Sequence, residues 1–136
     1  MKITICLDTS SYTEKILDGM KSIVMGFTTP EITVLHIIDE TMLYATTGAE
    51  TQINETLQNE NQQLADLCKQ YFGADINYIA EYGQPKLKSD EMLATLSFDL
   101  LVVGAHSHQN FENRLLGSFA EHLLQNSRKP ILVVPV

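Results

Sequence analysis

Two glycines and several hydroxyl and imidazole side chains lie in one stretch, residues 99–119, with the sequence D-L-L-V-V-G-A-H-S-H-Q-N-F-E-N-R-L-L-G-S-F. Gly104 follows an apolar run of strand character, and Gly117 precedes Ser118 and an amphipathic segment. A strand that leads through a loop into a helix N-terminus is where α/β folds place anions. The first backbone N–H groups of a helix lack partners, and the helix dipole is positive there. The chemistry that this stretch predicts is phosphate binding.

A second polar group, Asp8-Thr9-Ser10, follows the first apolar run of the chain. A carboxylate at a strand end can accept a hydrogen bond from a ribose hydroxyl or help to hold a cation. The alternative is that Asp8 caps the next helix or fixes the turn through the backbone.

The histidines give a weaker signal. His106 and His108 flank Ser107, a spacing that can chelate a metal or meet a phosphate when protonated. No third ligand is nearby in sequence, so we predict a solvated loop with no metal site and His106 as the phosphate neighbour. We expect His36 to be a hydrogen-bonded core histidine, and His122 to lie on the last helix without partners.

The composition excludes several classes of function. The chain has 136 residues and a formal net charge of −8, which argues against nucleic-acid and anionic-membrane binding. It has no leader-like segment, and no apolar run approaches the roughly 20 residues of a membrane span. Its two cysteines, Cys6 and Cys68, have neither metal-type nor disulfide spacing and are expected to be small buried hydrophobes in a reducing compartment. We therefore expect a cytoplasmic protein.

Apolar runs alternate with amphipathic segments along the whole chain. Helix boundaries are marked by a Ser11–Glu14 capping box, by Gly73 at a helix end and by Pro85 in a first turn, while Asn61 interrupts one helical stripe. The last helical face is expected to comprise Leu115, Leu116, Phe119, Ala120, Leu123 and Leu124. The strands are expected at residues 2–7, 32–38, 75–81, 100–103 and 131–134.

Five strands that alternate with four helices predict an α/β fold, a single domain over residues 1–136 with an open parallel sheet covered by helices on both faces. The pattern alone does not give the strand order. Residues 39–48 form a longer polar connection, of a length that is often functional, and covering a ligand is a candidate role for it.

These motifs together resemble the universal stress protein family. Gly104, position 107 and Gly117-Ser118 have the spacing of the family's G-2x-G-9x-G-[S/T] signature. The resemblance covers essentially the whole chain, and the other matching segments are Ile5-Cys6-Leu7-Asp8-Thr9-Ser10, Val34-Leu35-His36-Ile37-Ile38-Asp39, Gly83-x-Pro85 and Asp99-Leu100-Leu101. It implies a Rossmann-like sheet with strand order 3-2-1-4-5, whose switch point brings Asp8-Thr9-Ser10 beside Gly104.

The resemblance also implies a ligand, ATP or another adenine nucleotide. The carboxylates of Asp8, Asp39 and Glu40 are candidates to hold Mg²⁺ at the strand ends, and the alternative is that they serve solubility. The resemblance places Asp8 at the ribose and the main chain of Ile37 at the base. The phosphates would be met by Gly104, His106, Ser107, Gly117, Ser118 and the backbone of Phe119. The sequence has no Walker A loop and no catalytic triad, so we predict a binding protein with at most slow ATP hydrolysis.

One departure from the family opens an alternative. Position 107 is glycine in the nucleotide-binding branch but Ser107 here. If the backbone there is left-handed, a serine costs roughly 1–2 kcal/mol, against about 8 kcal/mol for micromolar binding. Strain alone would weaken nucleotide affinity about tenfold. The alternative function is a family member that no longer binds nucleotide and acts as a dimeric protein-interaction module.

The last strand predicts a partner. In the implied order, Ile131 to Val134 lies at a sheet edge, where unpaired backbone groups invite another strand. The family often dimerises through this strand, so a homodimer is expected. The alternative is an edge blunted by Pro130 and Pro135.

Receiver domains and flavodoxins share the fold class, but this sequence matches neither the acidic cluster of receiver domains nor the aromatic ring site of flavodoxins.

Overall fold

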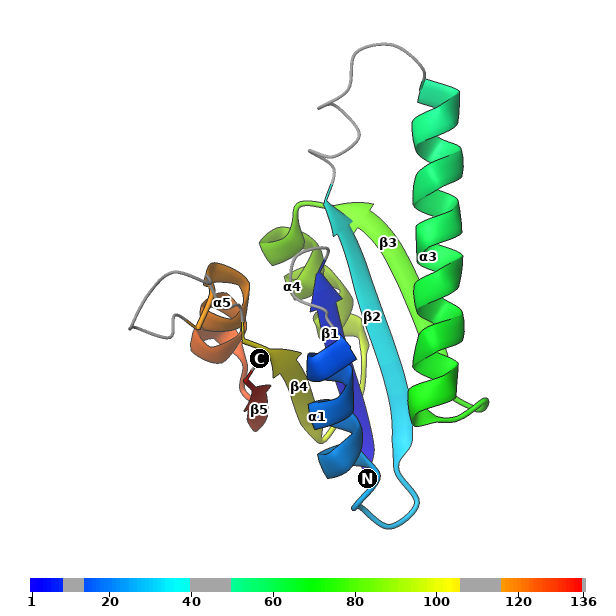
Figure 1. Cartoon of the computed structure of the whole chain (residues 1–136). Coiled ribbons are helices and arrows are strands. Elements are labelled where there is room, and N and C mark those ends of the chain that lie inside the picture. Colours follow the sequence, from blue (N-terminus) through cyan, green and yellow to red (C-terminus); the bar gives the residue numbers. More distant parts are fainter. Residues whose placement is uncertain (9–13, 40–49, 106–115, 136) are drawn as a thin grey trace.

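The computed structural model describes residues 1–8, 14–39, 50–105 and 116–135. Within these residues the chain forms five strands and four helices (Figure 1). The strands are β1 (Lys2–Asp8), β2 (Glu31–Asp39), β3 (Asn77–Gly83), β4 (Leu100–Gly104) and β5 (Ile131–Val134). The helices are α1 (Glu14–Val24), α3 (Glu50–Phe72), α4 (Pro85–Thr95) and α5 (Ser118–Asn126).

The strands form one sheet in the order β3-β2-β1-β4-β5, and every pairing is parallel. This confirms the predicted fold class and strand order. The central strand β1 is buried from Ile3 to Leu7, as a parallel strand covered on both faces must be. The order of pairing reverses at β1, which meets β2 on one side and β4 on the other.

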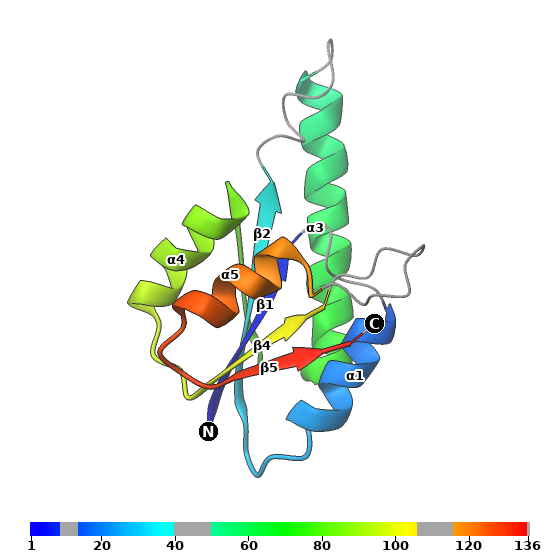
Figure 2. The same ribbon diagram turned by 90° about the vertical axis from the view of Figure 1, so that its left-hand side faces the viewer.

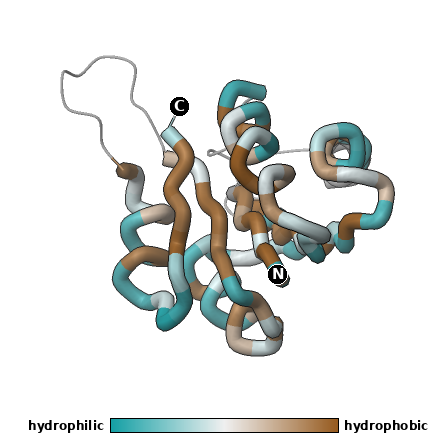
Figure 3. The backbone as a smooth tube through the Cα atoms, turned by 90° about the horizontal axis from the view of Figure 1, so that it is seen from below, coloured by the Kyte–Doolittle hydropathy of each residue, from teal (hydrophilic) through white to brown (hydrophobic). Residues whose placement is uncertain are grey.

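Helices cover both faces of the sheet and create two separate cores (Figures 1 and 2). On one face α1 and α3 pack on Ile5, Leu7 and Val34. On the other face α4 and α5 pack on the alternate strand residues, among them Leu35 and Ile37. Seen from below, the hydrophobic stretches of the backbone lie mainly along the strands, with hydrophilic segments outside them (Figure 3).

Two element boundaries differ from the expectation. β3 begins at Asn77 and ends at Gly83, two residues later than predicted at each end. Tyr82 and Gly83 continue the ladder opposite Ile38 and Asp39, so the glycine closes the strand instead of turning it. The helix that follows begins with Gln84 as N-cap, whose side-chain oxygen accepts a hydrogen bond of 2.8 Å from the Leu87 backbone N–H.

The helical stripes are narrower than the sequence predicts. On α1, the spacing of Ile16, Leu17, Met20, Ile23 and Val24 predicts one apolar stripe, but Ile23 is 40% exposed. On α5 the buried residues are Phe119, Ala120 and Leu123, while Leu124 is exposed and Leu116 precedes the helix. Leu115 lies outside the described residues. The narrower stripe follows from the shortness of α5, which presents one face of nine residues to the sheet.

Both cysteines are buried, as predicted, and no disulfide joins them. Burial raises the pKa of the Cys68 thiol to about 11, so this thiol remains protonated at neutral pH. None of the helices in the described ranges is both long and apolar enough to cross a membrane.

Candidate functional site

The switch point of the sheet brings together the backbone of two predicted site residues. The parallel register pairs Asp8, the last residue of β1, with Ile37 of β2. The Ile37 side chain is fully buried in the core beneath α4 and α5. A ligand at the strand ends would therefore meet Ile37 through its main chain, as the family resemblance implies.

The N-terminus of α5 is the helix end that the sequence predicts as the phosphate neighbour. Gly117 is the N-cap with a φ of 90° and a ψ of 146°, a conformation that L-residues rarely adopt. Its carbonyl accepts from the Glu121 N–H at 3.0 Å, so helical bonding starts there. Ser118 is the first helical residue and is exposed, and Phe119 is buried beside it. Gly117 has no side chain with which to cap this terminus, and uncapped N–H groups of a first turn can bind water or an anion.

Gly104 has a different role from Gly117. It is the last residue of β4 and pairs with Val134 of β5, and the next residue, Ala105, donates its N–H to the Val134 carbonyl at 2.8 Å. Among the described glycines only Gly73 and Gly117 have a positive φ. Gly104 therefore continues the ladder instead of turning out of it.

Several predicted site residues lie outside the described part of the chain: Thr9, Ser10, His106 and Ser107, together with Glu40 and the 40–48 connection. Among the described residues, Asp8 at the end of β1 is paired with Ile37 of β2, and Gly104 ends β4. Gly117, Ser118 and Phe119 form the start of α5.

A buried polar cluster supports this end of β2 from the opposite face. His36, next to Ile37, is 5% exposed, and its Nδ1 lies 3.0 Å from the Tyr78 hydroxyl and 3.1 Å from Asn61 Oδ1. The Tyr78 hydroxyl donates to Asn61 Oδ1 at 2.7 Å. When His36 Nδ1 carries the proton, it can donate toward the Tyr78 hydroxyl oxygen and Asn61 Oδ1 while the Tyr78 hydroxyl donates to Asn61 Oδ1. Each of the three contacts then has a donor and an acceptor. This confirms the predicted core histidine and explains why Asn61 interrupts the α3 stripe.

The cluster is expected to stabilise the fold more through Asn61 than through Tyr78. Asn61→Leu removes the acceptor that both other groups use, and we expect a loss of about 1–3 kcal/mol of unfolding free energy. Tyr78→Phe leaves the His36–Asn61 contact in place and should cost about 1 kcal/mol. Urea denaturation measures both values, and equal losses would contradict this division of roles.

Charged contacts connect α4 to its neighbours, and the sequence did not reveal them. The Lys88 ammonium lies 2.9 Å from a Glu81 carboxylate oxygen at the end of β3, and the hydrogen bond to Glu81 raises the pKa of Lys88. His122 Nε2 lies 2.9 and 3.0 Å from the two carboxylate oxygens of Asp90. The prediction that His122 has no partner was therefore wrong. The partner is 32 residues away, beyond any local pattern.

The parallel order and the reversal at β1 define a Rossmann-like α/β protein, a class of fold in which ligands bind outside the strand ends at such a switch point. The sequence matches the universal stress protein family over residues 1–135. The chain belongs to this family.

Individual relatives agree with this membership. The universal stress protein MJ0577 of Methanocaldococcus jannaschii is 24% identical to this chain in sequence, over 76% of each protein. A solved structure of hypothetical protein MJ0577 superimposes with a TM-score of 0.78 and 26% identity, covering 99% of this chain and 95% of that one. A universal stress protein in complex with cAMP has the same fold, with a TM-score of 0.62, 18% identity and coverages of 97% and 95%.

Proposed function

We propose that this protein binds an adenine nucleotide, ATP or a relative of it, at the β1/β4 switch point, and acts as a nucleotide-responsive module in the stress response. The single observation that carries the proposal is Gly117: the N-cap of α5 is a positive-φ glycine, which has no side chain to occupy the N–H groups of the first turn. The family is in keeping with this ligand, since one universal stress protein of the same fold was solved with cAMP. We further propose a cytoplasmic location and one domain over residues 1–136.

In the proposed site, Asp8 meets the ribose and the Ile37 main chain meets the base. The phosphates lie against Gly104, Ser107, Gly117 and Ser118, with the backbone of Phe119, and His106, Thr9 and Ser10 line the approach. The chain carries only nine Lys and Arg residues against 17 Asp and Glu. The positive potential for the phosphates would therefore come largely from backbone N–H groups and the helix dipole. Mg²⁺ would offset part of the phosphate charge.

Native mass spectrometry of the purified protein, followed by calorimetric titration with ATP and Mg²⁺, tests the proposal. The expected result is a copurified adenine nucleotide or a dissociation constant in the micromolar range. A Ser107→Gly variant run in parallel should bind up to about tenfold more tightly if the serine is strained in a left-handed conformation.

Absence of binding at millimolar nucleotide, from protein shown to be folded by circular dichroism, would contradict the proposal. If Ser107→Gly then bound while the native chain did not, the serine would have inactivated the crevice. The second candidate function, a dimeric interaction module without nucleotide, would take its place. The lack of a basic side chain among the described site residues favours that candidate.

We also propose a homodimer through β5. The strand pairs only with β4 among the described elements, and it lies at one end of the sheet. The carbonyls of Pro130 and Val134 accept from β4 and from Ala105. Alternation along the strand therefore directs the backbone groups of Ile131 and Val133 away from β4. A second copy, related by a twofold axis, would pair there in antiparallel fashion.

Size-exclusion chromatography with light scattering at micromolar concentration should give twice the 15.2 kDa mass of one chain. Val133→Pro removes an outward N–H while leaving the β4 ladder intact, and it should shift the protein toward monomer. A monomeric native chain would refute the dimer. A Val133→Pro variant that remained dimeric would move the interface elsewhere.

A further inference from the structure

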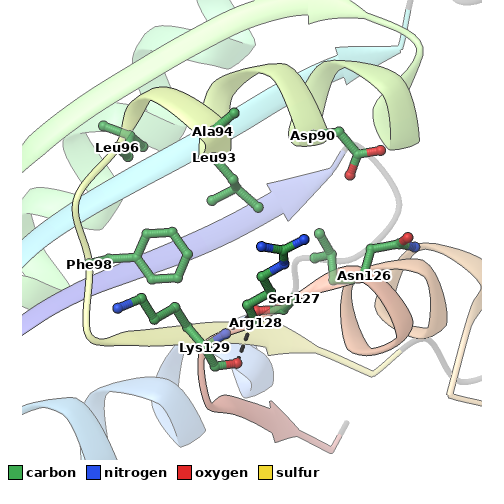
Figure 4. Close-up of a pocket in the computed structure, with 10 residues that line it drawn as sticks. Asp90, Leu93, Ala94, Leu96, Phe98, Asn126, Ser127, Arg128 and Lys129 are labelled. Carbon is green, nitrogen blue, oxygen red and sulfur yellow. Dashed lines mark hydrogen bonds between the residues drawn. The ribbon is translucent and has the colours of Figure 1, made fainter.

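A groove of about 610 Å³ lies between the carboxyl-terminal halves of α4 and α5 (Figure 4). The segment 96–98 that lines it precedes β4, and the segment 127–129 precedes β5. The groove therefore opens at the amino ends of these strands, whereas Asp8 and Gly104 are at the carboxyl ends. It is separate from the nucleotide crevice, and its volume is typical of small-molecule sites, about 300–1,000 Å³.

The floor of the groove is apolar and incompletely covered. Leu93, Leu96 and Phe98 pack on the core beneath α4 and α5 yet remain partly exposed. Leu123 lies below them and is buried. Figure 4 shows the Phe98 ring and the Leu93 side chain facing the space between the two helices. An aromatic or aliphatic body placed here would bury apolar area that now contacts water, which favours binding.

Two cations lie on the β5 side of this floor. The Arg128 guanidinium extends into the groove toward α4, and Lys129 runs along the side nearer Phe98 (Figure 4). No carboxylate of the described residues lies within ion-pair distance of either group. The one acidic side chain that lines the groove, Asp90, is engaged by His122 at 2.9 Å. In a chain with a net charge of −8, this pair of cations is a local site of positive potential.

We propose that this groove binds a small organic anion with an apolar body. The carboxylate, sulfonate or phosphate head lies between Arg128 and Lys129, and the body lies on Leu93, Leu96 and Phe98. A guanidinium presents paired donors to a planar or tetrahedral anion, which gives the head its orientation. The proposal is independent of the nucleotide site.

Two dyes that share an aromatic body test the proposal on the full chain. 1-Anilinonaphthalene-8-sulfonate carries the anionic head, and N-phenyl-1-naphthylamine lacks it. Fluorescence titration should give saturable 1:1 binding of the sulfonate, at least tenfold tighter than the uncharged dye. Binding of the sulfonate should weaken as salt is added, because the contacts are partly exposed. A saturating amount of ATP should not displace it.

Substitutions in the groove test whether the dyes bind there. The double variant Arg128→Gln/Lys129→Gln should lose about tenfold or more in affinity for the sulfonate and little for the uncharged dye. The matched control Lys15→Ala/Lys69→Ala removes the same charge from exposed positions on α1 and α3 and should bind as the native chain does. Ala94→Trp, at an exposed position on the groove wall, should fill the floor and reduce the binding of both dyes.

Circular dichroism and urea denaturation identify which variants are folded, and only folded variants count. The proposal is overturned if the sulfonate shows no saturable binding up to millimolar concentration. It is also overturned if the double variant and Ala94→Trp bind like the native chain, or if the two dyes bind equally well.

Discussion

Replacing Gly117 with alanine is expected to weaken adenine-nucleotide binding at least tenfold. The residue has a φ of 90°, and an added Cβ there costs roughly 1–2 kcal/mol of folding stability if the backbone stays in place, a cost that by itself does not change affinity. If the backbone relaxes instead, the N-cap of α5 turns and the first N–H groups no longer converge on one point. Each 1.4 kcal/mol of lost interaction is a factor of about ten in affinity. Calorimetric titration of the variant with ATP and Mg²⁺ measures the loss.

Gly73→Ala is the matched control for this experiment. Gly73 also has a positive φ, 114°, and closes α3 by donating its N–H to the Lys69 carbonyl at 2.9 Å. Apart from its two chain neighbours, none of the described residues has an atom within 4 Å of the Cβ that alanine would add, so backbone strain is its main cost. Both variants should lose about 1–2 kcal/mol of stability, but only Gly117→Ala should lose nucleotide. Equal nucleotide affinity in the two variants would show that Gly117 has no part in binding.

Gly19→Ala is expected to destabilise the protein, although alanine is normally favoured in a helix by about 1 kcal/mol. The alanine Cβ would lie 2.7 Å from Cγ1 of Val134, a distance that such carbons do not adopt. Val134 is 2% exposed and held in the β5 ladder, so it has little room to move. Overpacking of this kind costs roughly 1–3 kcal/mol. After the helix gain of alanine is subtracted, urea denaturation should show a net loss of up to about 2 kcal/mol.

The sign of this effect should reverse when Val134 is shortened. In a Val134→Ala background the contact with Cγ1 is absent, so Gly19→Ala should be neutral or stabilising by up to about 1 kcal/mol. The difference between the two backgrounds is the coupling free energy of the pair. A Gly19→Ala effect that is the same in both backgrounds would show that the α1–β5 contact does not limit this position.

Four of the strands were predictable as short apolar runs with β-branched residues, and β3 as an alternation of apolar and polar residues. Ile131–Val134 has the predicted bounds, and Leu100–Gly104 is one residue longer than predicted. The predicted bounds of β3 were two residues too early. Alternation shows which face of the sheet a residue lies on, but it does not show where pairing ends. The order of the strands came from the family resemblance, since no local pattern encodes which strands are neighbours.

The site was predictable only in part. The positive φ of Gly117 could be anticipated, because a glycine before a helical segment is a local signal. The His122–Asp90 pair and the groove lined by Phe98 and Arg128 could not, because they depend on how α4 and α5 lie against each other. Gln84 was missed as an N-cap because glutamine is not among the residues that usually cap helices.

The parallel pairing of the sheet has a consequence for how the chain acquires its structure. β1 pairs on one side with β2, about 30 residues downstream, and on the other with β4, where Ile3 lies opposite Leu100. The Lys2 N–H donates to an Asp99 carboxylate oxygen 97 residues away, at 2.8 Å. In a sheet without hairpins, the entropy cost of closing such loops comes before strand pairing contributes any stabilising free energy. Folding is therefore slower than for a helical bundle. During synthesis the β3-β2-β1 half can therefore assemble early, while the β4-β5 half must await the last third of the chain.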